Sequence, residues 1–239
     1  MELEKITDMP KATENASKRA EKRWYDDACG TALAMELVGE RWSLLIVREL
    51  MFGPRRFGEL KKALGGISAN VLTQRLEGME EAGILTRQKL PPPASVQVYG
   101  LTQWGYASER AIQELGRWAV QSHRHDTTLP LSAASLMLSF RTMIDRSRSG
   151  TVNAMIGFRL GDEDFVALVD AEGIAIRRAD RREAATVFAS DPVTMASIVY
   201  GGRPIADAEG AGSLSLSGDR ALAETFVTLF PLPPKTGSA

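Results

Sequence analysis

The chain is poor in the residues that usually build metal and redox sites: it has one cysteine and two histidines among 239 residues. A single cysteine excludes an internal disulfide and any zinc cluster made of several cysteines. The two histidines, at positions 123 and 125, lie in a polar stretch without companion ligands. The sequence also has no phosphate-binding glycine loop and no spacing typical of a nucleophile with its base. We therefore expect no cofactor, no metal site and no enzymatic activity.

Long apolar runs and an excess of one charge are missing as well. No segment approaches the roughly 18–20 apolar residues that a helix needs to cross a bilayer, so we expect no membrane association. Residues 1–27 are polar and lack the apolar core of a signal peptide, which favours a cytoplasmic protein. We expect this segment to be flexible or to associate with a dimer partner. The formal net charge is −1, so any attraction to a polyanion must come from a local arrangement of charges.

The most informative pattern lies between residues 40 and 101. A short amphipathic helix is predicted over residues 57–64, and Gly65-Gly66 is typical of a helix end. Ser68 then suits the N-cap of a second helix that runs to about residue 82. Its apolar residues Leu72, Leu76 and Met79 repeat at helical spacing and should face the core. Two helices joined by a glycine-containing turn predict a helix-turn-helix.

The other face of the second helix carries small and amide side chains, which fit the major groove of DNA. Asn and Gln can bind adenine through two hydrogen bonds, worth about 1–3 kcal/mol of discrimination each. We predict that Asn70, Thr73 and Gln74 read bases. An ordinary amphipathic surface helix is the alternative, because such helices also carry Asn, Thr and Gln. The expected phosphate contacts are polar and basic residues around this helix: Arg55, Lys61, Ser68, Arg75, Arg87 and Lys89.

Residues 83–89, a proline run and residues 96–99 predict two strands around a basic tip, which is a wing beside the helix-turn-helix. A further helix is predicted over residues 102–122. Its apolar side chains recur at helical spacing: Trp104, Ala107, Ala111, Leu115, Trp118 and Ala119. This helix follows the winged core, so its apolar face needs another surface. A partner helix in a homodimer is one answer, and the second half of the chain is the other.

Together these motifs resemble the HxlR-type, MarR-like bacterial transcription regulators over about residues 28–122. The segments that carry the resemblance are Cys29, residues 34–42 (AMELVGERW), 56–60 (RFGEL), 66–76 (GISANVLTQRL) and 99–105 (YGLTQWG). The resemblance implies a winged helix, a homodimer and binding of double-stranded operator DNA. It also admits a second role for Cys29, as a redox or electrophile sensor. The alternative for Cys29 is a small buried apolar residue.

The second half predicts an α+β layer domain after a linker at residues 123–131. An apolar helix over 131–144 precedes strands near residues 152–160, 165–169, 173–176 and 186–189. Asp191-Pro192 opens a helix, Leu214 and Leu216 alternate as in a strand, and Asp219 suits the cap of a last helix. With 44% hydrophobic residues, the chain can bury two cores. The predicted domains are 28–122 and 132–234, with a tail at 235–239.

The order of these elements resembles the sterol carrier protein type-two fold over roughly residues 132–234. The matching motifs are residues 191–192 (DP), 200–202 (YGG), 218–221 (GDRA) and the segment from Phe226 to Pro231. The resemblance implies a sheet covered by helices, with an apolar tunnel for a small hydrophobic ligand. Candidate lining residues, for which core packing is the alternative, are Phe140, Met143, Ile156, Phe158, Phe165, Met195, Ile198, Val199, Phe226 and Phe230.

The sequence therefore predicts a homodimeric DNA-binding transcription regulator modulated by a hydrophobic ligand in its second domain. A hydrophobic-ligand or lipid carrier with a vestigial winged domain is the rival. A regulator that senses oxidants or electrophiles through Cys29 is a further alternative. Lipid that copurifies without DNA affinity would favour the carrier.

Overall fold

The computed structural model describes residues 25–150 and 152–237, and the chain divides into two compact units, residues 1–40 and 41–239. In the first unit, the described part holds one helix, α1 (Gly30–Val38). The backbone N–H of Tyr25 donates to the Glu36 carboxylate at 2.7 Å, which ties the segment before the helix to its side. Within the described residues no helix is both long enough and apolar enough to cross a membrane.

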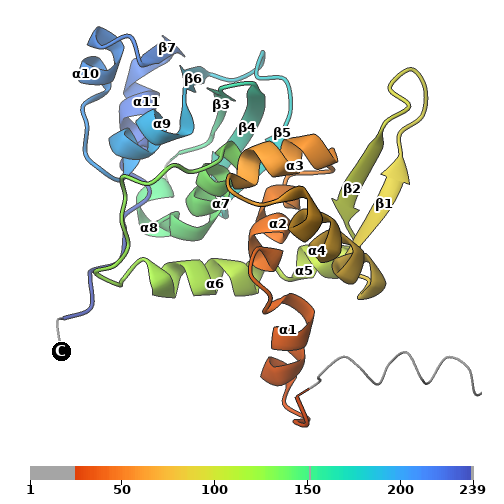
Figure 1. The fold of residues 1–239 in the computed structure, drawn as a ribbon. Coiled ribbons are helices and arrows are strands. Elements are labelled where there is room, and N and C mark those ends of the chain that lie inside the picture. Colours follow the sequence, from red (N-terminus) through yellow and green to blue (C-terminus); the bar gives the residue numbers. More distant parts are fainter. Residues whose placement is uncertain (1–24, 151, 238–239) are drawn as a thin grey trace, which may run out of the picture. The chain divides into compact units, whose positions relative to one another are not determined.

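The second unit begins with a winged helix (Figure 1). A trio of helices is followed by an antiparallel hairpin and two more helices. These elements are α2 (Ser43–Leu50), α3 (Phe57–Leu64), α4 (Ala69–Glu81), β1 (Leu85–Lys89), β2 (Gln97–Leu101), α5 (Gln103–Ala107) and α6 (Glu109–Ala119). The predicted helix-turn-helix and wing are confirmed, and α3 has the predicted bounds.

Local chemistry explains why α4 begins where it does. The Ser68 hydroxyl accepts a hydrogen bond from the Val71 N–H at 3.2 Å, which satisfies one donor of the first turn. Gly65 and Gly66 have φ values of 46° and 77°, a region that side chains disfavour, so the turn before α4 needs glycine. Leu72, Leu76 and Met79 are at most 2% exposed, as their spacing predicts.

The prediction of one continuous helix over residues 102–122 is wrong, because the chain breaks at Ser108 into α5 and α6. Both the N–H and the hydroxyl of Ser108 donate to the Gly105 carbonyl, at 3.2 and 2.7 Å. These bonds form a tight turn that replaces the regular hydrogen-bond pattern of an α-helix. A Cβ atom on Gly105 would lie 2.1 Å from the Ile84 carbonyl oxygen, so α5 is also pressed against the chain that precedes the wing.

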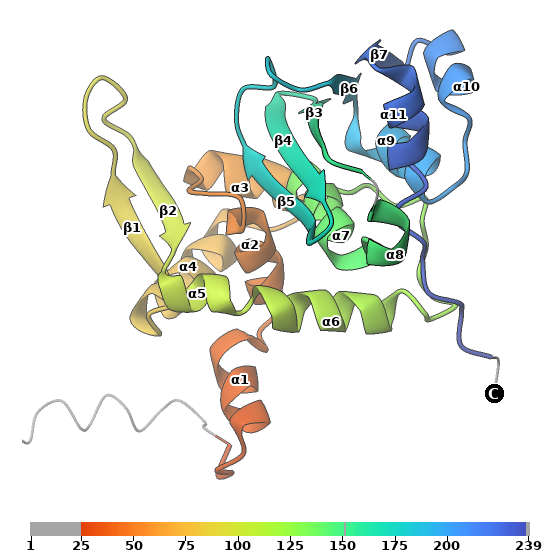
Figure 2. The same ribbon diagram turned by 180° about the vertical axis from the view of Figure 1, so that it is seen from behind.

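The rest of the unit is a five-stranded mixed sheet covered by helices (Figure 2). The strand order is β5-β4-β3-β6-β7, with β3 and β6 parallel and the other neighbours antiparallel. The elements are α7 (Ala133–Met143), α8 (Arg146–Ser149), β3 (Ala154–Leu160), β4 (Glu163–Asp170), β5 (Gly173–Arg178), β6 (Thr186–Ser190), α9 (Pro192–Val199), α10 (Ile205–Gly210), β7 (Leu214–Gly218) and α11 (Arg220–Phe226). The predicted strands and the capped helices α9 and α11 are confirmed, whereas the short helices α8 and α10 had no prediction.

A cluster of phenylalanines fills the space between this sheet and its helices. Phe140 of α7 stacks on Phe230 with ring centroids 4.6 Å apart, and Phe158 of β3 stacks on Phe188 of β6 at 5.7 Å. Phe226 of α11 contacts all four of these rings at 4.9 to 5.8 Å. All five side chains are at most 2% exposed, so they form a packed core.

The chain following α11 returns to the end of α6. The Lys235 ammonium donates to the carbonyls of Val120 and Ser122 at 2.8 and 3.0 Å. The Thr236 N–H donates to the Gln121 carbonyl at 2.9 Å. A cation at this place also suits the negative end of the α6 dipole. The segment that leads into the mixed-sheet part, residues 120–122, is thereby hydrogen-bonded to the segment that follows it, residues 235–236.

Candidate nucleic-acid interface

One face of α4 is open to solvent, and it is the face that carries the predicted base-reading residues. Ser68, Asn70, Thr73 and Gln74 are all exposed. The opposite face packs into the core through Leu72, Leu76 and Met79. The amide and hydroxyl side chains therefore project from a helix whose back is fixed by packing, which is the arrangement a recognition helix needs.

Arg75 lies beside this face and contacts Arg41, the first residue of the second unit. Its Nε donates to the Arg41 carbonyl at 3.2 Å. The guanidinium of Arg41 in turn lies 5.2 Å from the centre of the Trp42 ring. Trp42 has φ of 82°, a left-handed conformation that is rare for a bulky residue. The turn before α2 is therefore held by contacts that include Arg75 of α4.

The wing supplies positive charge next to α4. Arg87 and Lys89 lie on β1 and are exposed, and Lys61 is exposed on α3. The Arg87 guanidinium is 3.6 Å from the Glu80 carboxylate, but both side chains are partly solvated. Ion pairs of this kind contribute little to stability, so a phosphate could replace Glu80 at small cost. The three cations can contact a backbone that runs past the helix.

The structure contradicts the prediction that Arg55 contacts DNA. Its side chain is only 9% exposed and its guanidinium binds both oxygens of Glu163 at 2.8 Å. A second carboxylate, Glu49, lies 3.8 Å away. The sequence places Arg55 beside Arg56 in a basic turn, where an exposed cation is the ordinary expectation. The partner that buries it is 108 positions further along the chain, and local patterns do not report such a contact.

Large apolar side chains remain exposed on α5 and α6. Trp118 is 72% exposed, Trp104 55% and Leu115 47%. The other side of α6 packs against α7, where the Arg141 guanidinium binds both oxygens of Glu109 at 2.9 and 3.0 Å. The second half of the chain therefore covers one side of α6 and leaves the apolar side exposed, against one of the two alternatives drawn from the sequence.

Most residues predicted to line an apolar tunnel are core residues instead. Phe140, Ile156, Phe158, Phe165 and Phe226 are fully buried. The same holds for Met143, Met195 and Phe230, each at most 5% exposed. Spacing gives the inward direction of a side chain but not whether the space in front of it is filled.

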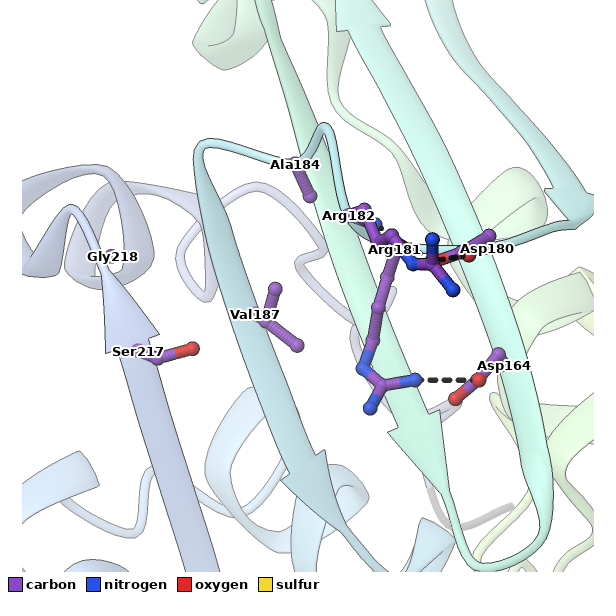
Figure 3. Close-up of a pocket in the computed structure, with 8 residues that line it drawn as sticks. All are labelled: Asp164, Asp180, Arg181, Arg182, Ala184, Val187, Ser217 and Gly218. Atoms are coloured by element: carbon purple, nitrogen blue, oxygen red, sulfur yellow. Dashed lines mark hydrogen bonds and ion pairs between the residues drawn. The ribbon is translucent and has the colours of Figure 1, made fainter.

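Two open pockets lie elsewhere on the mixed-sheet part. One, of about 440 Å³, lies between α9, α10 and α11, and includes Ile198 and Val199 from the predicted set, with Arg203 and Arg220 also in its lining. The other, of about 680 Å³, lies on the sheet beside the β5–β6 connection (Figure 3). There Arg181 pairs with Asp164 at 2.5 Å and Arg182 with Asp180 at 2.8 Å, so its charges are largely matched.

Cys29 precedes α1 at the N-cap position and is exposed, so its alternative interpretation as a buried apolar residue is wrong. Groups at the start of the helix, first the backbone N–H of Thr31 and then its hydroxyl, lower the pKa of the Cys29 thiol. A lower pKa raises the fraction of reactive thiolate at neutral pH.

Comparison with known proteins places the exposed helix in a family. Residues 37–127 match the model of the HxlR-like helix-turn-helix family. The transcriptional regulator YodB of Bacillus subtilis is 40% identical over 88 residues, which cover 37% of this chain and 79% of YodB. This chain belongs to the HxlR-like helix-turn-helix transcriptional regulators. An uncharacterised HTH-type transcriptional regulator of Mycobacterium tuberculosis, Rv3095, is 44% identical over 96 residues, which cover 40% of this chain and 59% of that protein.

Solved structures of YodB also match part of the chain. The reduced form of B. subtilis YodB is 36% identical and covers 42% of this chain and 100% of YodB, with a TM-score of 0.38. The quinone-bound form, also 36% identical, covers 38% of this chain and 96% of that structure, with a TM-score of 0.34.

Proposed function

We propose that this HxlR-like regulator binds operator DNA as a homodimer, with α4 in the major groove and the wing along the backbone. The observation that carries the proposal is the two-sided character of α4. Asn70, Thr73 and Gln74 are exposed while the opposite side of the helix is buried. These three residues read bases, and the contacts to phosphates come from Lys61, Ser68, Arg75, Arg87 and Lys89.

The exposed apolar face of α5 and α6 supports the homodimer. Trp104 on α5 and Leu115 and Trp118 on α6 are all exposed, and aromatic residues dominate the energetics of interfaces. A second copy has the same face, so a two-fold axis pairs the two surfaces. Such symmetry sets two recognition helices about 34–36 Å apart, one turn of DNA.

For the second domain, residues 132–234, we propose a sterol-carrier-like fold that binds a small hydrophobic effector. The pocket between α9, α10 and α11 supports this, because Ile198, Val199 and Val227 give it an apolar wall. An effector changes DNA binding only if its affinity differs between the DNA-competent and DNA-incompetent dimers.

Cys29 supports a second candidate, a regulator that responds to electrophiles or oxidants. Its thiol is exposed and its pKa is lowered by the start of α1. The relative YodB has been solved in a quinone-bound form, which makes a quinone the natural probe. Incubation with benzoquinone should add mass to the chain at Cys29 and change its DNA affinity, and Cys29→Ser should abolish both effects. An adduct without a change in affinity would exclude the sensor.

Selection of sites from a random 30-base-pair duplex library tests the DNA-binding proposal. Asn70→Ala and Gln74→Ala should each relax base preference, by about 1–3 kcal/mol at the positions they read. Arg87→Ala should weaken binding to all sequences alike and reduce the salt slope by about one. Asn153→Ala, an exposed amide in the second domain, is the matched control and should change neither property. The proposal fails if the first three variants bind like the unmodified chain.

A further inference from the structure

Arg55 joins three parts of the second unit. Its backbone exchanges two hydrogen bonds with Tyr99 of β2, at 2.9 and 2.8 Å. Its side chain leaves in the other direction and binds both carboxylate oxygens of Glu163, the first residue of β4. Arg55 itself lies in the turn between α2 and α3. One residue therefore connects the helix-turn-helix, the wing and the mixed sheet.

The surroundings hold this guanidinium in a single place. Glu163 also accepts from Arg178 of β5 at 2.8 and 3.1 Å. Glu49 of α2 is fully buried, 3.8 Å from Arg55, and accepts from the Ser132 hydroxyl at 2.6 Å. A buried charge that loses one partner is strongly destabilised. Arg55 must therefore move together with Glu163 if β4 shifts.

Further contacts around the Arg55–Glu163 ion pair join the helix-turn-helix to the mixed sheet. The Phe52 ring of the α2–α3 turn meets Phe165 of β4 edge to face, with centroids 5.7 Å apart. The guanidinium of Arg141 on α7 lies 4.5 Å from the centre of the Phe52 ring. At the rim, Lys62 of α3 pairs with Asp162 at 3.1 Å. The turn between β3 and β4 thus rests on the helix-turn-helix.

The path from Arg55 continues into the wing. Tyr99 pairs with Arg55 on one side and stands opposite Arg87 of β1 on the other. Glu163, Arg55, Tyr99 and Arg87 are therefore successive neighbours, each pair joined by a side-chain or strand contact. Arg87 is one of the two wing cations, with Lys89, that the proposed function assigns to DNA phosphates.

We infer that Glu163, acting through Arg55, positions the wing for DNA, so that the mixed-sheet domain controls how the wing meets the phosphates. Arg55 and Glu163 are positioning residues in this scheme and touch no DNA. A displacement of β4 is transmitted because the two-oxygen ion pair and the two backbone bonds of Arg55 are both directional. The effect on DNA binding rests on the proposed function, whereas the link from Glu163 through Arg55 to the wing does not.

Hydrogen exchange in the full-length protein tests the structural part without DNA. In Glu163→Gln and Glu163→Ala, the amides of Arg55 and Tyr99 should exchange at least about tenfold faster, because a charged hydrogen bond that limits local opening is lost. The amides of β6 and β7 should keep their rates, which shows that the variants remain folded. Unchanged rates at Arg55 and Tyr99, or an equal increase throughout the chain, would overturn the inference.

Asp164→Asn is the matched control. Asp164 is the next residue of β4, but it faces the other side of the sheet and pairs with Arg181 within the mixed-sheet part (Figure 3). The two substitutions remove the same charge from adjacent positions. We expect no change at Arg55 and Tyr99 in Asp164→Asn. Faster exchange at these amides in both variants would mean that the response reports general damage to the sheet.

Fluorescence anisotropy with a random-sequence 30-base-pair duplex tests the consequence. Glu163→Gln should weaken binding about three- to tenfold, the range of a displaced charged contact. In a chain that already carries Arg87→Ala and Lys89→Ala, the same substitution should have no further effect. An equal loss of DNA affinity in the unmodified chain and in the Arg87→Ala, Lys89→Ala chain would overturn the inference that Glu163 acts through the wing. If the unmodified chain does not bind duplex DNA, the proposed function fails, and the exchange result still decides whether Glu163 holds the wing.

Discussion

Truncation of Trp118 should separate the proposed homodimer into single chains. This side chain is 72% exposed on α6, the largest exposed fraction among the large apolar residues of the described chain. A tryptophan offers roughly 250 Å² of surface, so about 180 Å² is available for burial, worth up to about 4 kcal/mol. Truncation of a central interface tryptophan commonly costs about 2–4 kcal/mol. A two-fold interface contains the residue twice.

Trp118→Ala should therefore raise the dimer dissociation constant by at least about a thousandfold, since each 1.4 kcal/mol is tenfold. Sedimentation equilibrium over a range of protein concentrations measures this constant directly. Leu129→Ala is the matched control, because Leu129 is 61% exposed but lies in the linker and belongs to neither α5 nor α6. It should leave the constant unchanged.

The reasoning would be refuted by a Trp118→Ala chain that dimerises as tightly as the unmodified protein. A monomeric unmodified protein at micromolar concentration would refute it equally, because a face of this size would then have no self-complementary partner. The melting temperature of Trp118→Ala should equal that of the unmodified protein diluted until it is monomeric. An exposed side chain contributes little to the stability of one chain.

Two further substitutions test local features. Ser68→Ala removes the cap of α4 and should lower the free energy of unfolding by about 1 kcal/mol in urea denaturation, whereas Ser68→Asp should retain most of it. A loss from Ser68→Asp as large as that from Ser68→Ala would show that the loss does not come from the missing N-cap acceptor. Burial raises the pKa of the Asp191 carboxyl, but hydrogen bonds from the Thr194 hydroxyl and N–H outweigh this and leave the pKa lowered. A lowered pKa in the folded state means stability that is present above about pH 4 and is lost as the pH falls through the folded pKa. Asp191→Ala should therefore destabilise α9 at pH 7, and its difference from the unmodified protein should shrink in denaturation series taken below about pH 4.

The parts of the fold that follow from neighbouring residues could be predicted from the sequence. Ser68, Asp191 and Asp219 each cap the helix that follows, and all three accept the expected backbone hydrogen bond. The alternation in residues 154–160 likewise gave β3. Such signals act over three or four residues, so they do not depend on the rest of the fold.

Features set by distant residues could not be predicted. The apolar spacing runs through Ser108 without interruption, and the break there depends on how Gly105 meets Ile84. Arg55 looks like any surface cation until its partner, 108 positions later, is known. The parallel pairing of β3 with β6 brings together strands separated by two others. No pattern within one strand contains that information.

The contacts of Lys235 and Thr236 with residues 120–122 bring the two ends of the mixed-sheet part together at one place in the chain. A segment that leaves and returns at one place can be exchanged as a cassette, because both junctions are fixed by the same few backbone bonds. Other modules of similar span, spliced between the end of α6 and Lys235, would inherit this anchorage. A module inserted in this way would need a carboxylate at the place of Glu163, because the retained winged helix still contains the buried Arg55.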